Sequence, residues 1–174
     1  GLEKGDLITL AGASSLGKTT LALQWAMNAA QGYEGQTRKV VPLYVTLEMP
    51  PKKMVYKTLS MRTGIPVRQM QRGQISSEQL ADIGLAVSEA EDIEMEYVAR
   101  IKDTKKSVAG FIERIQLKTK NLADLVVFID TLQLFSRGES IENQFAAIAR
   151  ASEELKELTI DYNIPIVQLS QLTI

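Results

Sequence analysis

The residue types best suited to chemistry in this sequence stand together near its start. Gly12-Ala13-Ser14-Ser15-Leu16-Gly17-Lys18-Thr19 fits the pattern G-x-x-x-x-G-K-[ST] without a gap, between an apolar run and an amphipathic stretch. Glycines let such a loop curl so that successive backbone N–H groups point at a phosphate, and the positive end of the following helix adds to the attraction. The segment therefore predicts a nucleotide-binding site, and its spacing excludes the G-x-G-x-x-G loop of dinucleotide-binding proteins.

The side chains in this loop have different expected roles. Lys18 places a compact positive charge against the β- and γ-phosphates of ATP, which makes it both a binding and a catalytic residue. The hydroxyl of Thr19 is a suitable ligand for Mg²⁺. The residues expected to contact the nucleotide are Ala13, Ser14, Ser15, Leu16, Gly17, Lys18, Thr19 and Thr20.

Three further polar side chains stand where apolar runs end, and ligands of open α/β sheets bind beyond the carboxyl ends of the strands. Asp130 is suited to hold the Mg²⁺ shell opposite Thr19, or to serve as a turn or N-cap residue. Glu48 can orient the attacking water, or cap the segment before Pro50. Gln171 can sense the γ-phosphate and relay its presence to neighbouring loops, although a simple strand-end role is equally compatible with its position.

Two alternating kinds of segment can position these residues. Short continuous apolar runs are typical of strands buried on both faces of a parallel sheet, and the longer amphipathic stretches between them are typical of helices. The expected strands are Leu7–Ala11, Val40–Leu47, Leu125–Ile129 and Ile164–Leu169, with Glu96–Ile101 as a weaker candidate. The expected helices are Lys18–Ala30, Ser77–Glu94, Ser107–Lys120 and Ile141–Tyr162. This alternation predicts an α/β fold of three layers around a mostly parallel central sheet.

Helical spacing also predicts which side chains share the apolar face of a helix. Those near one face of the first helix are Leu21, Ala22, Trp25 and Ala29, and those that recur at helical spacing in the second are Leu80, Ile83, Val87 and Ala90. In the last helix, the residues expected to face inward are Phe145, Ile148, Ala149, Leu155 and Leu158. Trp25 can pack against the sheet or stack on a base, and packing is the commoner use of a helical tryptophan. Ser76 or Ser77 is expected to cap the start of the second helix.

Composition excludes several kinds of site. The chain has no cysteine and no histidine, which excludes disulfides, His/Cys zinc sites and any Ser-His or Cys-His catalytic pair. The formal net charge of −1 means that nucleic-acid binding has to come from a local patch. No apolar run is long enough to span a bilayer, and we expect a cytoplasmic protein with no membrane partner. Residues 1–174 are expected to be one ATPase domain of a longer chain, because Gly1–Asp6 contains neither a methionine nor an apolar signal segment.

Charge is segregated along the middle of the chain. The charged residues are all basic from 50 to 73 and all acidic from 74 to 96. These segments can be two solvated helices that attract one another within the domain, or complementary subunit faces in a ring. The mainly basic stretch 102–120 likewise predicts either a solvated helix face or a surface that follows a nucleic-acid backbone.

Taken together, these segments resemble the RecA-like ATPase domain of DnaB-type replicative helicases, and the resemblance covers nearly the whole chain. The start, Gly1–Ile8, is similar to that family's entry into the domain, and Arg72–Ser76 resembles the stretch after its recognition-helix region. Thr46-Leu47-Glu48-Met49 resembles the motif S-L-E-M. Ile129-Asp130-Thr131-Leu132-Gln133-Leu134 resembles I-D-Y-L-Q-L, with Thr131 in place of the tyrosine, and Gln168-Leu169-Ser170-Gln171-Leu172 resembles A-L-S-Q-L. Such motifs in order are far more specific than a P-loop alone.

The resemblance implies a RecA-like P-loop ATPase that forms a ring hexamer, with ATP and Mg²⁺ between subunits and single-stranded DNA in the central channel. It implies 5′-to-3′ unwinding during replication, and a primase or helicase loader as a further partner. By this analogy Glu48 is the catalytic base, Asp130 the metal-shell acid and Gln171 the γ-phosphate sensor. Arg137 lies where the family has its DNA-facing loop, and the family's arginine finger is expected after Ile174.

Two other functions are compatible with a P-loop. A RecA-like or KaiC-like switch ATPase would use ATP to assemble on DNA or a protein partner without unwinding. Arg137 is the only base of the expected DNA-facing loop, which favours that alternative. A small-molecule kinase would need an arginine-rich lid over its second substrate, and the sequence shows none. Glu48 and Gln171 also suit water better than an acceptor hydroxyl.

Overall fold

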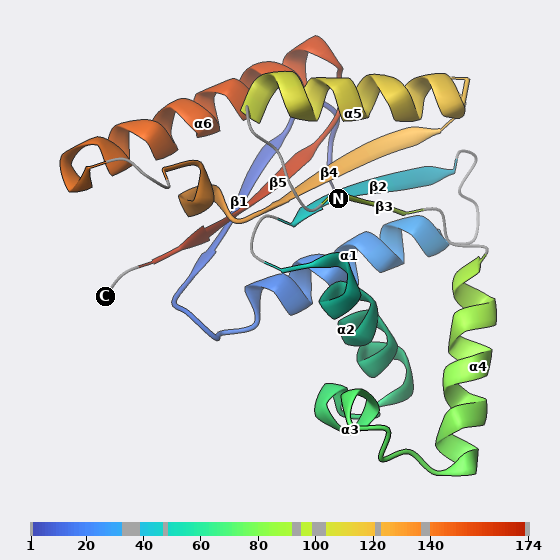
Figure 1. Ribbon diagram of the computed structural model, residues 1–174. Coiled ribbons are helices and arrows are strands. Elements are labelled where there is room, and N and C mark those ends of the chain that lie inside the picture. Colours follow the sequence, from blue (N-terminus) through green and yellow to red (C-terminus); the bar gives the residue numbers. More distant parts are fainter. Residues whose placement is uncertain are drawn as a thin grey trace.

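A sheet of parallel strands forms the centre of the computed structural model, which describes residues 2–32, 39–46, 49–91, 95–98, 104–120, 123–136 and 140–172. Its five strands lie in the order β1-β5-β4-β2-β3 and all neighbours are parallel (Figure 1). They are β1 (Leu7–Gly12), β2 (Val40–Thr46), β3 (Glu96–Val98), β4 (Asp124–Asp130) and β5 (Ile166–Gln171). The parallel sheet that the apolar runs predict is confirmed.

Burial explains why these runs are strands. Every β4 residue from Leu125 to Asp130 is buried, as is every β2 residue from Val41 to Thr46, because both strands are covered on both faces. The last apolar run pairs as a strand from Ile166 rather than from Ile164, since Pro165 has no N–H to donate. The weaker candidate is a short strand at the edge of the sheet.

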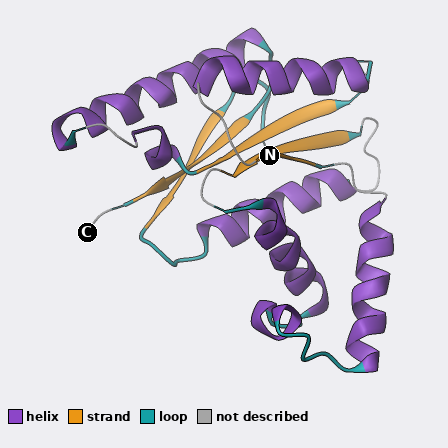
Figure 2. Cartoon of the chain, viewed as in Figure 1, coloured by secondary structure: helices purple, strands orange, loops and turns teal. Residues whose placement is uncertain are grey.

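Helices cover both faces of the sheet, which gives the predicted three layers (Figures 1 and 2). On one face lie α5 (Thr104–Lys118) and α6 (Ile141–Asp161), and on the other lies α1 (Lys18–Gln31) with the start of α2 (Pro51–Thr63). The chain also forms α3 (Val67–Gln71), α4 (Ser77–Glu91) and a short 3-10 helix, η1 (Leu132–Ser136). Within the described ranges, no helix combines the length and the apolar character that crossing a bilayer requires.

The core alternates between the two faces of the strands. On β4, Val127 and Ile129 pack towards α5 and α6, whereas Val126 and Phe128 pack towards α1. Trp25 is half-buried against this second cluster, so the expected packing role is confirmed. The expected apolar face of α1 is partly wrong, because the Leu21 side chain is 42% exposed. The buried residues of α1 are Ala22, Leu23, Ala26 and Met27. In α6, Leu155 and Leu158 are buried as expected, whereas Phe145, which is 80% exposed, and Ala149 were wrongly expected to face inward.

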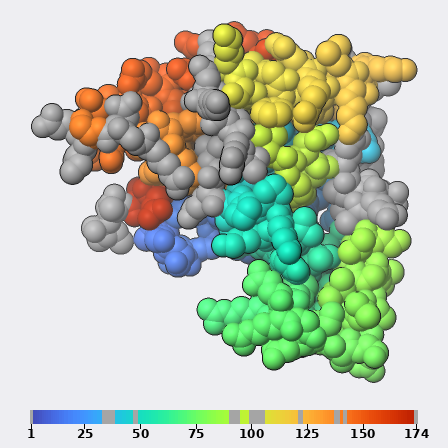
Figure 3. Space-filling model, in the orientation of Figure 1, coloured from blue at the N-terminus to red at the C-terminus, as the bar shows by residue number. Residues whose placement is uncertain are grey.

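The helices α2, α3 and α4 project from the body of the molecule (Figure 3). Ser76 caps α4 as expected: its Oγ accepts from the Gln79 N–H at 3.2 Å, and the Gln79 side chain accepts from the Ser76 N–H at 3.1 Å. The apolar residues at helical spacing in α4 are only partly covered, since Ile83 is half-buried but Leu80 is 58% and Val87 44% exposed. This helix packs beside α2 rather than on the sheet, so its apolar stripe stays largely uncovered.

An ion pair joins the basic and acidic segments of the middle of the chain. The Arg62 guanidinium in α2 lies 3.3 Å from the Glu89 carboxylate in α4. This contact favours attraction between two helices of the same domain. In the basic stretch, Arg114 and Lys118 of α5 likewise pair with Glu96, at 3.6 and 3.1 Å, which favours a solvated helix face there.

Candidate nucleotide-binding site

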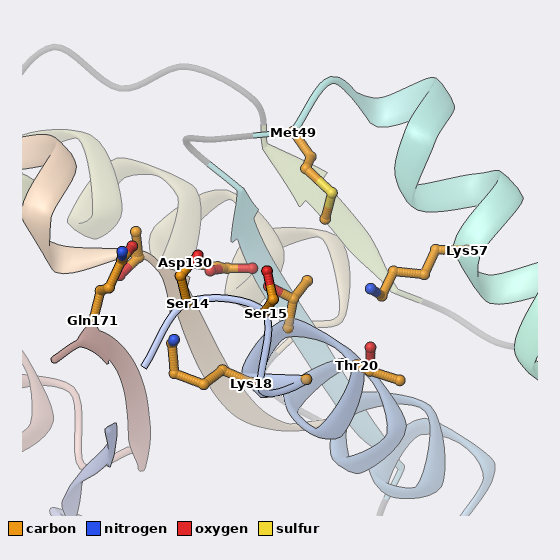
Figure 4. Close-up of a pocket in the computed structure, with 11 residues that line it drawn as sticks. Ser14, Ser15, Lys18, Thr20, Met49, Lys57, Asp130 and Gln171 are labelled. Atoms are coloured by element: carbon orange, nitrogen blue, oxygen red, sulfur yellow. The ribbon is translucent and has the colours of Figure 1, made fainter. Parts of the chain in front are cut away.

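A pocket of about 300 Å³ lies beyond the carboxyl ends of the central strands (Figure 4). The strand register explains its position, because Gly12 pairs with Gln171 and Thr46 pairs with Asp130, so that four strands end at one edge. The described residues that line it are Ser14, Ser15, Gly17, Lys18, Thr19, Thr20, Met49, Lys57, Asp130, Thr131 and Gln171. Eight of the sequence-predicted site residues therefore meet in one pocket, and they come from three separate parts of the chain.

The loop between β1 and α1 presents backbone N–H groups to this pocket. Gly17, the N-cap residue of α1, has φ +88°, a left-handed conformation that favours glycine. No side chain therefore caps the first N–H groups of α1 at this position. The first N–H groups of a helix have no partner within the helix, and they suit an anion. Of the other predicted contacts, Ala13 and Leu16 do not line the pocket, and the Leu16 side chain is 74% exposed.

The ammonium of Lys18 is oriented by the loop itself. It donates to the carbonyl oxygens of Gly12 at 2.7 Å and Ala13 at 2.8 Å. A lysine ammonium has three N–H groups, so these two bonds fix its direction and leave a third donor for a phosphate oxygen. The methylenes of Lys18 lie 3.6 Å from the position that a Cβ at Gly12 would take, which keeps this part of the loop compact.

Asp130 is 3% exposed and accepts a hydrogen bond from a residue that the sequence did not single out. The hydroxyl of Tyr44 on β2 lies 3.2 Å from its Oδ2. The ring of Tyr44 is fully buried and stacked on Phe128, with centroids 5.7 Å apart. Burial first, and then the nearby Asp130 charge, raise the pKa of Tyr44 far above its ordinary value, so it stays a donor to the carboxylate.

The wall opposite the loop comes from the segment after β2. The Thr46 hydroxyl donates to the Met49 carbonyl at 3.0 Å and accepts from the Met49 N–H at 3.2 Å. Glu48, predicted as the base, lies outside the described residues, between these two partners in the sequence. Lys57 also lines this wall, from α2, with its amine directed into the pocket (Figure 4). Lys57 could not be singled out from the sequence, because it is one of several lysines of this segment and none of them has motif spacing.

The oxygen donors of the pocket fit a magnesium ion. Thr19 and Asp130 supply a hydroxyl and a carboxylate to the same pocket, and Mg²⁺ prefers a few such ligands together with phosphate oxygens. Gln171, the expected γ-phosphate sensor, lines the pocket at the end of β5. Arg137, the expected DNA contact, lies outside the described residues.

Comparison with known proteins places this geometry in a family. Residues 1–173 match the model of the DnaB-like helicase C terminal domain. The chain is 35% identical over 175 residues to a protein of Chlamydia trachomatis serovar L2 named "Probable plasmid replicative DNA helicase", covering 99% of this chain and 36% of that protein. The chain therefore spans little more than a third of the length of such relatives.

Solved structures share the fold. One that is described as the ATPase domain of a larger protein is similar with a TM-score of 0.83 and 21% identity, over 98% of this chain and 58% of that one. A second, "The Structure Of A DnaB-Like Replicative Helicase And Its Interactions With Primase", has a TM-score of 0.84 and 22% identity, over 99% of this chain and 40% of that one. The RecA-like fold implied by the sequence resemblance is confirmed.

Proposed function

This chain belongs to the family of DnaB-like helicase C-terminal domains, and from that premise we propose that it is the ATP-hydrolysing motor of a replicative DNA helicase. The observation that carries the proposal is the pocket in which the P-loop, Asp130 and Gln171 meet at the carboxyl edge of a parallel sheet. Family membership supports this function over the switch ATPase that the P-loop alone also allows.

The proposed reaction is attack of water on the γ-phosphate of ATP, which yields ADP and inorganic phosphate. The N–H groups at the start of α1 and the ammonium of Lys18 hold the phosphates. Thr19 and Asp130 would hold Mg²⁺, which would neutralise negative charge on the ATP phosphates. Glu48 takes the proton from the attacking water, and Gln171 contacts the γ-phosphate.

The proposed assembly is a ring of identical subunits, a hexamer, around single-stranded DNA. Support comes from the family and from a relative named as a replicative DNA helicase. A primase is a proposed further partner, because one structural neighbour is described together with its interactions with primase. A helicase loader is a second proposed partner, which the motif resemblance implies. We further propose that Arg137 contacts the DNA and that the motor moves 5′ to 3′, as the motif resemblance implies.

The proposal is tested on the full-length protein by measuring ATP turnover with and without single-stranded DNA, together with displacement of a strand from a forked duplex. We expect DNA to stimulate turnover and ATP to drive displacement on a 5′ tail. Lys18→Ala should abolish ATP binding, whereas Glu48→Gln should keep binding and lower turnover by roughly two to four orders of magnitude. ATP-dependent DNA binding without strand displacement would instead identify a switch ATPase.

A further inference from the structure

Within the described residues, the end of β5 has no strand neighbour on one side. On its other side β1 pairs with it as far as Gln171, and the Leu172 N–H donates to the Gly12 carbonyl at 3.0 Å. Its pairing with β4 covers only Ile166 to Gln168. The backbone groups of Gln171 that face η1 therefore need partners other than a strand, since strand-end peptide groups that are left unpaired cost stability.

The side chain of Gln133, in η1, supplies these partners. Its Oε1 accepts from the Gln171 N–H at 3.0 Å, and its Nε2 donates to the Gln171 carbonyl at 3.1 Å. The carboxamide thus copies the pair of bonds that a residue of a neighbouring antiparallel strand would make with Gln171. Its Nε2 also lies 3.0 Å from the Ser170 Oγ.

Gln133 is itself held on the other side. The Thr131 hydroxyl lies 2.8 Å from both the Gln133 Oε1 and the Leu169 carbonyl, so its proton is shared between the two oxygens. The Ser136 hydroxyl donates to the Gln133 carbonyl at 2.8 Å. Thr131 directly follows Asp130, so a short chain of bonds joins the metal-shell aspartate to the end of β5.

We infer that Gln133 is a positioning residue that sets where Gln171 stands relative to the γ-phosphate. The inference rests on the proposed function, in which Gln171 contacts that phosphate. Gln133 is not among the residues that line the pocket, and its side chain reaches the reaction only through the backbone of Gln171. Without the two hydrogen bonds from the Gln133 carboxamide, the backbone of Gln171 is held only by its pairing with β1. A displacement of about 1 Å in a group that orients substrate costs roughly 100-fold in rate.

The test begins with Gln133→Met in the full-length protein, since methionine keeps the length of the side chain and removes its hydrogen bonds. We expect kcat for ATP to fall roughly 10- to 100-fold, whereas the Kd for ADP, which has no γ-phosphate, changes by less than about twofold. Gln133→Asn, which is too short for both bonds, should give the same split and provides a second variant if the first unfolds. The control is Gln24→Met, which removes an amide hydrogen bond of 2.8 Å on α1 outside the pocket.

A double-mutant cycle with Gln171→Ala then separates positioning from a general structural role. If Gln133 acts through Gln171, the double variant has the kcat of Gln171→Ala alone, because no sensor remains to be misplaced. The inference would be overturned if the two substitutions lowered kcat by independent factors that multiply in the double variant, or if Gln133→Met left kcat unchanged. Parent-like turnover in Gln171→Ala would remove the sensor role and the inference with it, while ATP binding that depends on Lys18 would leave the proposed nucleotide site standing.

Discussion

Two lysines face the nucleotide pocket from different elements, Lys18 from the start of α1 and Lys57 from α2. Figure 4 shows the Lys57 amine across the pocket from Lys18, on the side of Thr20. The pocket therefore presents positive charge from two walls, and a polyphosphate placed between them gains from both. The P-loop pattern predicts only the first of these charges.

Lys57→Gln should weaken binding of Mg²⁺-ATP. Hydrogen bonds to charged groups contribute about 1.5 to 3 kcal/mol, and the half-exposed position of Lys57 favours the lower end, so we expect a loss of roughly tenfold in affinity. Titration with a fluorescent ATP analogue measures the change. The matched control is Lys53→Gln, an exposed lysine one turn earlier on the same helix that does not line the pocket. Equal affinities for the two variants would show that Lys57 does not reach the phosphates.

Tyr44→Phe removes the buried donor to Asp130 and should destabilise the fold by about 1.5 to 3 kcal/mol near neutral pH. The difference should depend on pH in a defined direction. Burial raises the pKa of Tyr44 in the folded protein above the value of about 10 that it has in the unfolded chain. As the pH rises above 10, Tyr44 ionises first in the unfolded chain, so the stability that Tyr44 contributes to the folded protein is lost. Above that pH the stability gap between parent and variant should narrow by about 1.4 kcal/mol per pH unit.

Chemical denaturation of both proteins between pH 7 and 11 measures this gap. Tyr97, whose pKa burial also raises, is present in both proteins and cancels in the difference. A gap that stays constant up to pH 11 would contradict a buried neutral Tyr44.

At the scale of elements, α4 packs beside α2, and the ion pair of Arg62 and Glu89 joins the two helices. The Arg62 side chain is 11% exposed, whereas that of Glu89 is 55% exposed, and the guanidinium Nη1 is buried without a hydrogen-bond partner in the described part of the chain. The carboxylate of Glu89 therefore offsets much of the desolvation cost of burying the Arg62 guanidinium.

Glu89→Ala should lower the free energy of unfolding by about 1 to 2 kcal/mol, because it leaves a mostly buried charge without its carboxylate. Thermal or urea unfolding measures the loss. Asp82→Ala is the control, since this exposed acid of α4 makes no ion pair in the part of the chain that the structure describes, and its replacement should change stability by less than about 0.5 kcal/mol. A similar loss in both variants would mean that the general charge of α4, and not the pair, stabilises this helix.

At the scale of the whole molecule, the described lining of the pocket contains lysines as its only cations and no arginine. In P-loop enzymes, an arginine supplied by a neighbouring subunit or partner is worth about 10³ to 10⁵ in turnover, or roughly 4 to 7 kcal/mol. That effect exceeds the roughly tenfold effect expected of Lys57 and any effect expected of Thr131 in the place of the motif's tyrosine. Assembly should therefore control activity more strongly than these two features of the pocket.

We expect this chain alone to bind ATP but to hydrolyse it very slowly, and turnover per subunit in the full-length protein to rise with protein concentration as rings form. Turnover measured across a concentration series, with analytical ultracentrifugation at the same concentrations, checks this. Brisk hydrolysis by a monomer of this chain, independent of concentration, would refute a cation supplied in trans.

How far the sequence predicts this protein depends on the range of the interactions concerned. The P-loop is contiguous, and its placement between a strand and a helix follows from local patterns, so Gly17, Lys18 and Thr19 could be assigned without a structure. Continuous apolar runs likewise predicted a parallel sheet, and the rule that ligands lie at carboxyl ends of strands predicted that Asp130 and Gln171 would meet the P-loop. Glu48 and Arg137 lie outside the described residues and remain predictions.

Tertiary structure decided what periodicity and motifs cannot express. Helical spacing shows that α4 has an apolar stripe but not whether another element covers it, and for the same reason Phe145 of α6 was wrongly expected to face inward. Tyr44 reaches Asp130 across 86 positions of sequence, and Gln133 reaches Gln171 across 38. Such contacts exist only once strands far apart in the chain lie side by side in a given register. The sequence thus determined the chemistry of the nucleotide site, and only the packed sheet determined which side chains orient it.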